Sequence, residues 1–199
     1  MTLQLLVVSG ALALVLGTLI AIARVSPVPI LRRVAATYVT FFRNTPLLVL
    51  LLITYYGLPE IGIIWSFFTL VTLAMGTYTA SFVAEALRSG VNSVSMGQAE
   101  AARAIGLPFT QTMTQVVLPQ SFRAVVPPLA SVFIALAKNT SLAAAFGVLE
   151  ATFRMRGLLN DRPDERPLIF LGIALGYIVI VELISLGSQL LERRWKVER

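Results

Sequence analysis

The feature that most constrains this chain is a series of apolar runs, each long enough to cross a lipid bilayer as a helix. The first run, Leu3–Ala23, is almost uninterrupted, and about 20 apolar residues are needed to span the hydrocarbon core. Four similar runs follow, at roughly Tyr38–Tyr56, Trp65–Leu87, Leu129–Val148 and Leu168–Leu191. The sequence therefore predicts an all-α integral membrane bundle with five transmembrane helices.

Composition supports a membrane protein and excludes several kinds of chemistry. The chain is 57% hydrophobic and 13% charged, with a mean hydropathy of +0.82, which is far from a soluble domain. It contains neither cysteine nor histidine, so the commonest metal ligands and nucleophiles are missing. We expect no metal site, no catalytic site and no enzyme activity. The net charge of +6 is explained by basic residues at the ends of apolar runs rather than by nucleic-acid binding.

The basic residues also predict an orientation. Arg24, Arg32 and Arg33 follow the first run and no basic residue precedes it, so this run is a transmembrane helix rather than a signal peptide. Cytoplasmic segments are enriched in Lys and Arg, which places the N-terminus outside the cell. The segment Glu192–Lys196 is basic and aromatic, as expected for an anchor at the cytoplasmic C-terminus.

The segment Ser95–Pro119 is a polar island between the third and fourth runs. Ser95 and Gln98 have the spacing of a capping box, which starts a helix. Gly106 offers the left-handed conformation that ends a helix, and Pro108 prevents its continuation. The predicted helix is therefore only about three turns long.

This short helix has small side chains along much of its surface. Glu100 and Arg103 are spaced i, i+3, and Leu107 is placed to fold back toward Ala102. A helix of this length is marginal in water on its own. We expect it to be stabilised by docking into a groove of another protein, through the alanines Ala99, Ala101, Ala102 and Ala104.

Polar residues interrupt the second and fourth runs. The first interruption, Arg43–Pro46, is either a snorkelling anchor with a proline kink or part of a lined pathway. The second, Lys138–Ser141, places Lys138 near the midplane if Leu129–Val148 is one crossing. An ionisable residue at that depth is either functional or neutralised by a neighbouring carboxylate, for which Glu182 is the candidate.

The third run carries hydroxyl groups and one carboxylate in its second half. Thr77, Thr79 and Ser81 have the small, hydroxylated character of helix packing surfaces in membranes, and a polar pathway is the alternative. Glu85 precedes Arg88 by one turn, so the two are expected to form a structural ion pair.

The motifs resemble a known family. Glu100-Ala101-Ala102, Gly106, Val116 and Leu118-Pro119 have the spacing of the E-A-A loop in permease subunits of bacterial ATP-binding-cassette (ABC) importers. The segments F-x-R-N-T-P-L, S-F-V-A-E-A-L-R-S-G-V-N and A-K-N-T-S-L resemble permeases for polar amino acids, the histidine, glutamine, arginine and glutamate group. They are most similar to the glutamate-importer permeases of actinobacteria.

The resemblance implies roles for particular residues. ATPase coupling is implied for Gly97, Gln98, Glu100, Ala101, Ala102, Arg103, Gly106, Leu107 and Pro108. A place along the translocation pathway is implied for Arg43, Asn44, Thr45, Thr77, Tyr78, Ser81, Lys138, Asn139, Thr140 and Ser141. Structural roles are expected for Glu85, Arg88 and Pro119.

The resemblance also implies partners and a mechanism. Residues 1–199 would form one permease domain, with a cytoplasmic coupling loop at about 89–118 and an outer loop at about 150–167. A cytoplasmic ATPase dimer would carry ATP and Mg²⁺, so this chain would bind no cofactor itself. A second permease, identical or related, and an external substrate-binding protein would complete an importer of a polar amino acid in the bacterial cytoplasmic membrane. The alternative is an ATP-independent carrier or channel.

Overall fold

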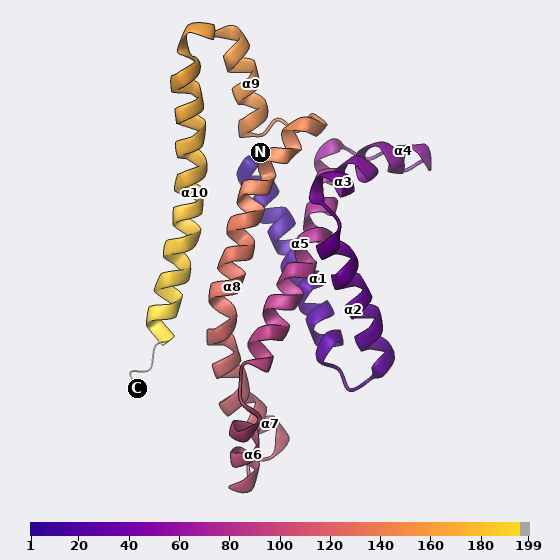
Figure 1. The fold of residues 1–199 in the computed structure, drawn as a ribbon, viewed down its shortest axis with the longest axis vertical. Helices are drawn as coiled ribbons and strands as arrows, with labels where there is room; N and C mark the ends of the chain where they lie inside the picture. The colour runs from indigo at the N-terminus through magenta and orange to yellow at the C-terminus, as the bar shows by residue number, and fades with distance from the viewer. Residues whose placement is uncertain (196–199) are drawn as a thin grey trace.

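The computed structural model describes residues 1–195, and helices account for nearly all of its regular structure (Figure 1). The α-helices are α1 (Thr2–Val25), α2 (Pro29–Asn44), α3 (Leu47–Leu52), α4 (Leu58–Glu60), α5 (Phe67–Asn92), α6 (Met96–Ala104), α7 (Phe109–Gln111), α8 (Leu118–Asn139), α9 (Ala151–Asp161) and α10 (Arg166–Trp195). The segments Ile53–Gly57 and Thr112–Val117 are π-helical, and Thr140–Phe146 and Pro163–Glu165 are 3₁₀ turns. The expected all-helical membrane bundle is confirmed.

Four stretches of the described chain are long and apolar enough to span a membrane as continuous helices, and they contain α1, α5, α8 and α10. A fifth span exists if α2 and α3–α4 count as one broken crossing, which bends by 99°. The predicted second crossing at roughly Tyr38–Tyr56 therefore corresponds to a broken span, with its break at the predicted interruption Arg43–Pro46. Thr45 has extended backbone, as expected for a residue that precedes proline, and the helix restarts after Pro46.

The core lies where α1 packs along α5. Leu5, Met75 and Leu136 are fully buried there. Close approach depends on small residues, because a Cβ atom on Gly17 would lie 2.6 Å from Cβ of Val83. Small residues at helix interfaces let membrane helices pack closely where no hydrophobic driving force is available.

The fourth crossing begins earlier than the apolar run indicated. Helix α8 starts at Leu118 and continues through Pro127 and Pro128. At 1.5 Å per residue it is about 33 Å long, close to the ~30 Å of the hydrocarbon core. Lys138 lies in its last turn, rather than midway along a helix that runs from Leu129 to Val148. Prolines inside transmembrane helices are tolerated when neighbouring groups satisfy the freed backbone.

The segment predicted as an outer loop is largely helical. Glu150 is fully buried and caps α9 by accepting hydrogen bonds from the N–H groups of Thr152 and Phe153, at 2.9 and 2.8 Å. The same carboxylate accepts a hydrogen bond of 2.9 Å from the hydroxyl of Tyr177 on α10. The carboxylate of Glu150 thus links α9, which was predicted as part of a loop, to α10, which contains the predicted last span.

Short helices and connections lie at both ends of the bundle. Helices α6 and α7 lie at one end, and the connection between α1 and α2 points the same way (Figure 1). Helices α4 and α9 lie toward the opposite end (Figure 1). The arginine-rich connection and the predicted coupling helix therefore share one side of the bundle, as expected. Of the predicted C-terminal anchor, Lys196 lies outside the described residues.

Candidate functional site

Helix α6 begins where the sequence predicts, but without the predicted capping box. Ser95 is its N-cap residue, and its side chain makes no capping hydrogen bond. Instead, the backbone N–H of Gln98 donates to the carbonyl oxygen of Ser95 at 3.0 Å. The carbonyl oxygen of Ser95, rather than its hydroxyl, therefore accepts the hydrogen bond from the first turn of α6.

The C-terminal end of α6 has the predicted glycine-terminated geometry. Gly106 has a φ of +89°, in the left-handed region. Its N–H donates to the carbonyl of Arg103 at 2.9 Å, and the N–H of Leu107 donates to the carbonyl of Ala102 at 3.1 Å. This pair of bonds is the Schellman motif, and Pro108 follows it. The direction in which the chain leaves α6 is therefore well defined.

The surface of α6 is mostly open. Ala102 is buried, in keeping with the packing of α6 on the π-helical turn Thr112–Val117. Leu107 is half-buried, and the remaining predicted coupling residues are exposed. Among residues 1–195, Glu100 and Arg103 do not form an ion pair.

Three large apolar side chains flank the small residues of α6. Met96 and Ile105 are each 79% exposed, and Phe109 is 71% exposed. Sequence reasoning singled out the alanines and overlooked these three, although each lies at an end of the short helix or of the following turn. Each of the three therefore presents apolar surface on the segment that carries the predicted coupling residues.

A charge cluster joins α1 to α5 near the α6 end. Glu85 pairs with Arg88, as predicted, with 3.1 Å between Oε1 and Nε. The other carboxylate oxygen lies 3.3 Å from Nη2 of Arg24. Sequence reasoning missed Arg24 because the two residues are far apart in the chain. The Glu85 carboxylate is therefore paired with two guanidinium groups, as expected for a charged group on a helix of a membrane bundle.

A polar cavity of about 410 Å³ lies beside this cluster. Its charged and polar lining comes from α1, α2 and α5. The guanidinium carbon of Arg43 lies 5.5 Å from the ring centroid of Phe82, which is within the range of a cation–π interaction. The residues that line the cavity are Arg24, Val39, Thr40, Arg43, Asn44, Phe82 and Glu85.

A second cavity, of about 300 Å³, lies between α5 and α8. Tyr78 and Asn139, two predicted pathway residues from separate helices, both line it. Phe82 lines both cavities, and its ring centroid is 5.0 Å from that of Tyr78. The structure thus brings Arg43, Asn44, Tyr78 and Asn139 to two neighbouring cavities separated by one aromatic ring.

Other predicted pathway residues of the helices are turned away from these cavities. Ser81 and Thr140 are fully buried, and their hydroxyls donate to carbonyls of their own helical segments at 2.7 and 2.6 Å. Thr77 donates to the carbonyl of Leu73 at 2.8 Å, and Thr45 to that of Phe41 at 2.8 Å. For Thr77 and Ser81 these local hydrogen bonds agree with the packing interpretation, and a pathway role for the four residues stays a prediction.

Lys138 and Ser141 lie near the end of α8, outside both cavities. Ser141 donates to the carbonyl of Lys138 at 2.8 Å. The Lys138 side chain is exposed, and no ion pair with Glu182 is formed among residues 1–195. Of the two alternatives for Lys138, pairing with Glu182 is therefore not formed, and the lysine lies in the last turn of its helix. Pro119 lies in the first turn of α8, directly after the π-helical segment Thr112–Val117.

These features define a class of protein. A helical membrane bundle with polar cavities and a short, exposed helix between two spans has the architecture of a transport subunit. The family described as "binding-protein-dependent transport system inner membrane component" matches residues 13–197. The chain belongs to this family.

Known relatives agree with the resemblance seen in the motifs. The glutamate transport system permease protein GluC of Corynebacterium efficiens is 36% identical over 210 residues, covering 100% of this chain and 92% of the relative. The probable glutamine ABC transporter permease protein GlnM of Bacillus subtilis is 36% identical over 188 residues, covering 94% of this chain and 87% of the relative. The chain is therefore homologous to permease subunits of ABC transporters.

Solved structures show the same fold. A crystal structure of an amino acid ABC transporter with histidines is 30% identical and has a TM-score of 0.89, covering 98% of this chain and 90% of that chain. An inward-facing structure of the methionine ABC transporter MetNI is 22% identical and has a TM-score of 0.74, covering 98% of this chain and 93% of that chain. The second comparison concerns the fold alone.

Proposed function

We propose that this chain is the permease subunit of an ABC importer that moves a polar amino acid into the cytoplasm, with glutamate as the favoured substrate. The observation that carries this proposal is the joint presence of an exposed coupling helix and polar cavities in one bundle of the matching family. The relatives that transport glutamate and glutamine support the substrate class. We propose that the N-terminus lies outside and the C-terminus in the cytoplasm of a bacterial cell.

Helix α6 is the proposed contact with a cytoplasmic ATPase dimer. Its exposed small residues would let it enter a groove, and Met96, Ile105 and Phe109 would supply apolar contact area around it. The sequence has no G-x-x-x-x-G-K-[ST] loop, the motif that cradles nucleotide phosphates. ATP and Mg²⁺ are therefore assigned to the partner, which closes on ATP and moves α6.

A second permease and an external binding protein complete the proposed importer. The polar cavity is bordered by exposed Arg43 and Asn44 at the break between α2 and α3. Exposed polar groups at membrane depth are tolerated where they line a water-filled cavity, so a second permease, identical or related, would face them. Helix α9 and the start of α10 form the surface proposed for the external protein.

The net charge of the larger polar cavity favours an acidic substrate. Its charged lining comprises Arg24, Arg43 and Glu85, so cations exceed anions there. Among residues 1–195, Arg43 takes part in no ion pair, which leaves its guanidinium available to a substrate carboxylate. Lys138 lies outside this cavity, near the outer end of α8; on the resemblance of its motif we propose that it also contributes, and Lys138→Ala is expected to lower glutamate uptake.

The test is reconstitution with the cognate ATPase and binding protein. Substrate-stimulated ATP hydrolysis and uptake would be measured in vesicles with glutamate, glutamine, histidine and arginine. Gly106→Val should abolish both activities and release the ATPase during purification, because a β-branched residue is strained at positive φ. Gly62→Val is the matched control, since Gly62 also has a positive φ, of 82°, and lies outside the coupling helix.

The outcomes separate the importer from an ATP-independent carrier or channel. Uptake that requires ATP and is lost in Gly106→Val supports the importer. Uptake that continues without nucleotide, or full ATPase stimulation in Gly106→Val, would overturn it. Stimulation by arginine or histidine but not by glutamate would retain the importer and reject the favoured substrate.

A further inference from the structure

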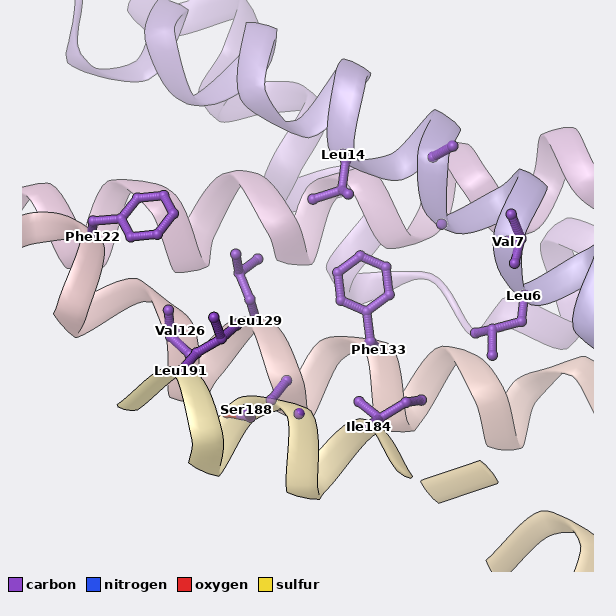
Figure 2. A pocket seen from close by; sticks show the side chains of 14 residues that line it. Leu6, Val7, Leu14, Phe122, Val126, Leu129, Phe133, Ile184, Ser188 and Leu191 are labelled. Carbon is purple, nitrogen blue, oxygen red and sulfur yellow. The ribbon is translucent and has the colours of Figure 1, made fainter. Parts of the chain in front are cut away.

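An apolar groove of about 600 Å³ runs between α1, α8 and α10. Figure 2 shows Phe133, Leu129 and Ile184 directed into the space between these helices. Small residues, including Gly10 and Gly187, deepen it. Ser188 is the one hydroxyl among the described residues that line it. The groove therefore suits a flexible hydrocarbon and offers almost nothing to a polar ligand.

The groove faces away from the proposed pathway. On α8, Phe122, Val126 and Phe133 line the groove, whereas Ala135 and Asn139 line the polar cavity. At 3.6 residues per turn, the mean directions of these two sets differ by about 140° around the helix axis. A second permease that completes the pathway would approach the other face, so the groove is left to the surrounding bilayer.

The length of the groove corresponds to one leaflet. Between Phe122 and Phe133, α8 rises by about 16 Å, and half of a typical hydrocarbon core is about 15 Å thick. The Phe122 end lies near the start of α8, toward α6 (Figure 1). With the proposed orientation, which this inference adopts, this end reaches the inner, cytoplasmic interface.

A basic recess adjoins that end. Phe122 also lines a recess of about 360 Å³ together with Leu118, Pro119 and Arg123. Arg123 is exposed and forms none of the ion pairs found within residues 1–195. Anionic lipids at the cytoplasmic surface attract basic residues placed at this level.

We propose that the groove is a binding site for an anionic phospholipid of the inner leaflet. One acyl chain lies along the groove between α8 and α10, and the phosphate lies beside Arg123. The lipid fills the space beside α10, whose apolar span has none of its residues buried within the described bundle. The acyl chain of the bound lipid thereby packs against both α8 and α10 and stabilises their arrangement.

The assembled transporter would be purified in mild detergent and titrated with phosphatidylglycerol or phosphatidylcholine of identical acyl chains, with native mass spectrometry as the readout. Gly187→Leu should remove retained lipid of both kinds, because its side chain enters open space in the groove. Arg123→Gln should reduce the preference for phosphatidylglycerol about fivefold, which corresponds to about 1 kcal/mol. Both variants should keep the helical content and assembly of the wild type.

One control comes from α10 itself, and the other is a cation on the side of the membrane where Arg123 lies. Gly176→Leu also enters open space on α10 but does not line the groove, and Arg33→Gln removes an exposed cation of α2. Both should retain lipid like the wild type. Equal lipid loss in Gly176→Leu and Gly187→Leu, or unchanged retention in Gly187→Leu, would overturn the proposal.

The alternative occupant is a second copy of the chain. The sequence lacks cysteine, so Gly187→Cys introduces a single thiol into the groove. Absence of a disulfide-linked pair under oxidation supports the lipid, whereas rapid formation of that pair would overturn it. ATP-driven uptake by the wild type, measured in the same preparations, tests the proposed importer separately.

Discussion

Gly90 of α5 lies against Val125 of α8 so closely that a Cβ atom on Gly90 would be 2.1 Å from Cγ2 of Val125. It would also lie 3.1 Å from the carbonyl oxygen of Ser121. This contact is near the end of α5 and the start of α8, the two helices that flank the coupling helix α6. It therefore holds together the segments through which a movement of α6 would reach the bundle.

Gly90→Ala is expected to lower stability by about 1–3 kcal/mol, the usual cost of overpacking. Thermal unfolding of the purified protein measures the change. Adding Val125→Ala should recover most of the loss, because it removes the methyl group that clashes. Gly176→Ala is the control, since a Cβ there meets nothing within 4 Å. A Gly90→Ala protein as stable as the wild type would contradict the close contact.

Glu85→Gln is expected to destabilise the bundle, because it leaves the guanidinium groups of Arg24 and Arg88 without their shared carboxylate. The pair Arg24→Gln and Glu85→Gln should not be additive, with a coupling energy of about 1 kcal/mol. Denaturation of the two single variants and the double variant measures this energy. Strict additivity would mean that the 3.3 Å contact between Arg24 and Glu85 contributes nothing to stability.

Tyr177→Phe is expected to cost about 1.5–3 kcal/mol, the range for a hydrogen bond to a charged group. It removes the 2.9 Å bond that links α10 to the buried carboxylate of Glu150. Proteolysis between α9 and α10 should become faster. Tyr56→Phe, at a 64% exposed position, should behave like the wild type. Equal protease resistance of both variants would show that the bond does not hold α9 to α10.

Arg43→Gln is expected to lower glutamate uptake about tenfold while changing glutamine uptake little, because only glutamate carries the side-chain carboxylate that a guanidinium would pair with. Uptake of both amino acids into the same vesicles measures the ratio. Arg33→Gln, an exposed position on the same helix, is the control. A parallel decrease for both substrates would assign Arg43 to general structure rather than to charge selection.

Local features of this protein could be predicted from short stretches of sequence. The apolar runs indicate the spans, Gly106 and Pro108 indicate the end of α6, and the spacing of Glu85 and Arg88 indicates their ion pair. Each depends on residues within a few positions of one another, where periodicity, turn geometry and side-chain reach decide the outcome. The capping box at Ser95 failed even locally, because a backbone carbonyl accepted the bond instead.

The amino-acid sequence by itself determined that the chain is a helical membrane bundle with a short helix between two of its spans. Only the tertiary structure decided that Arg24 joins Glu85 and that Tyr78 and Asn139 share a cavity. It also decided that Lys138 lies at the end of α8, away from Glu182. These relationships join helices that are distant in the chain, and their register depends on how small residues such as Gly17 and Gly90 let the helices approach, which no local pattern specifies.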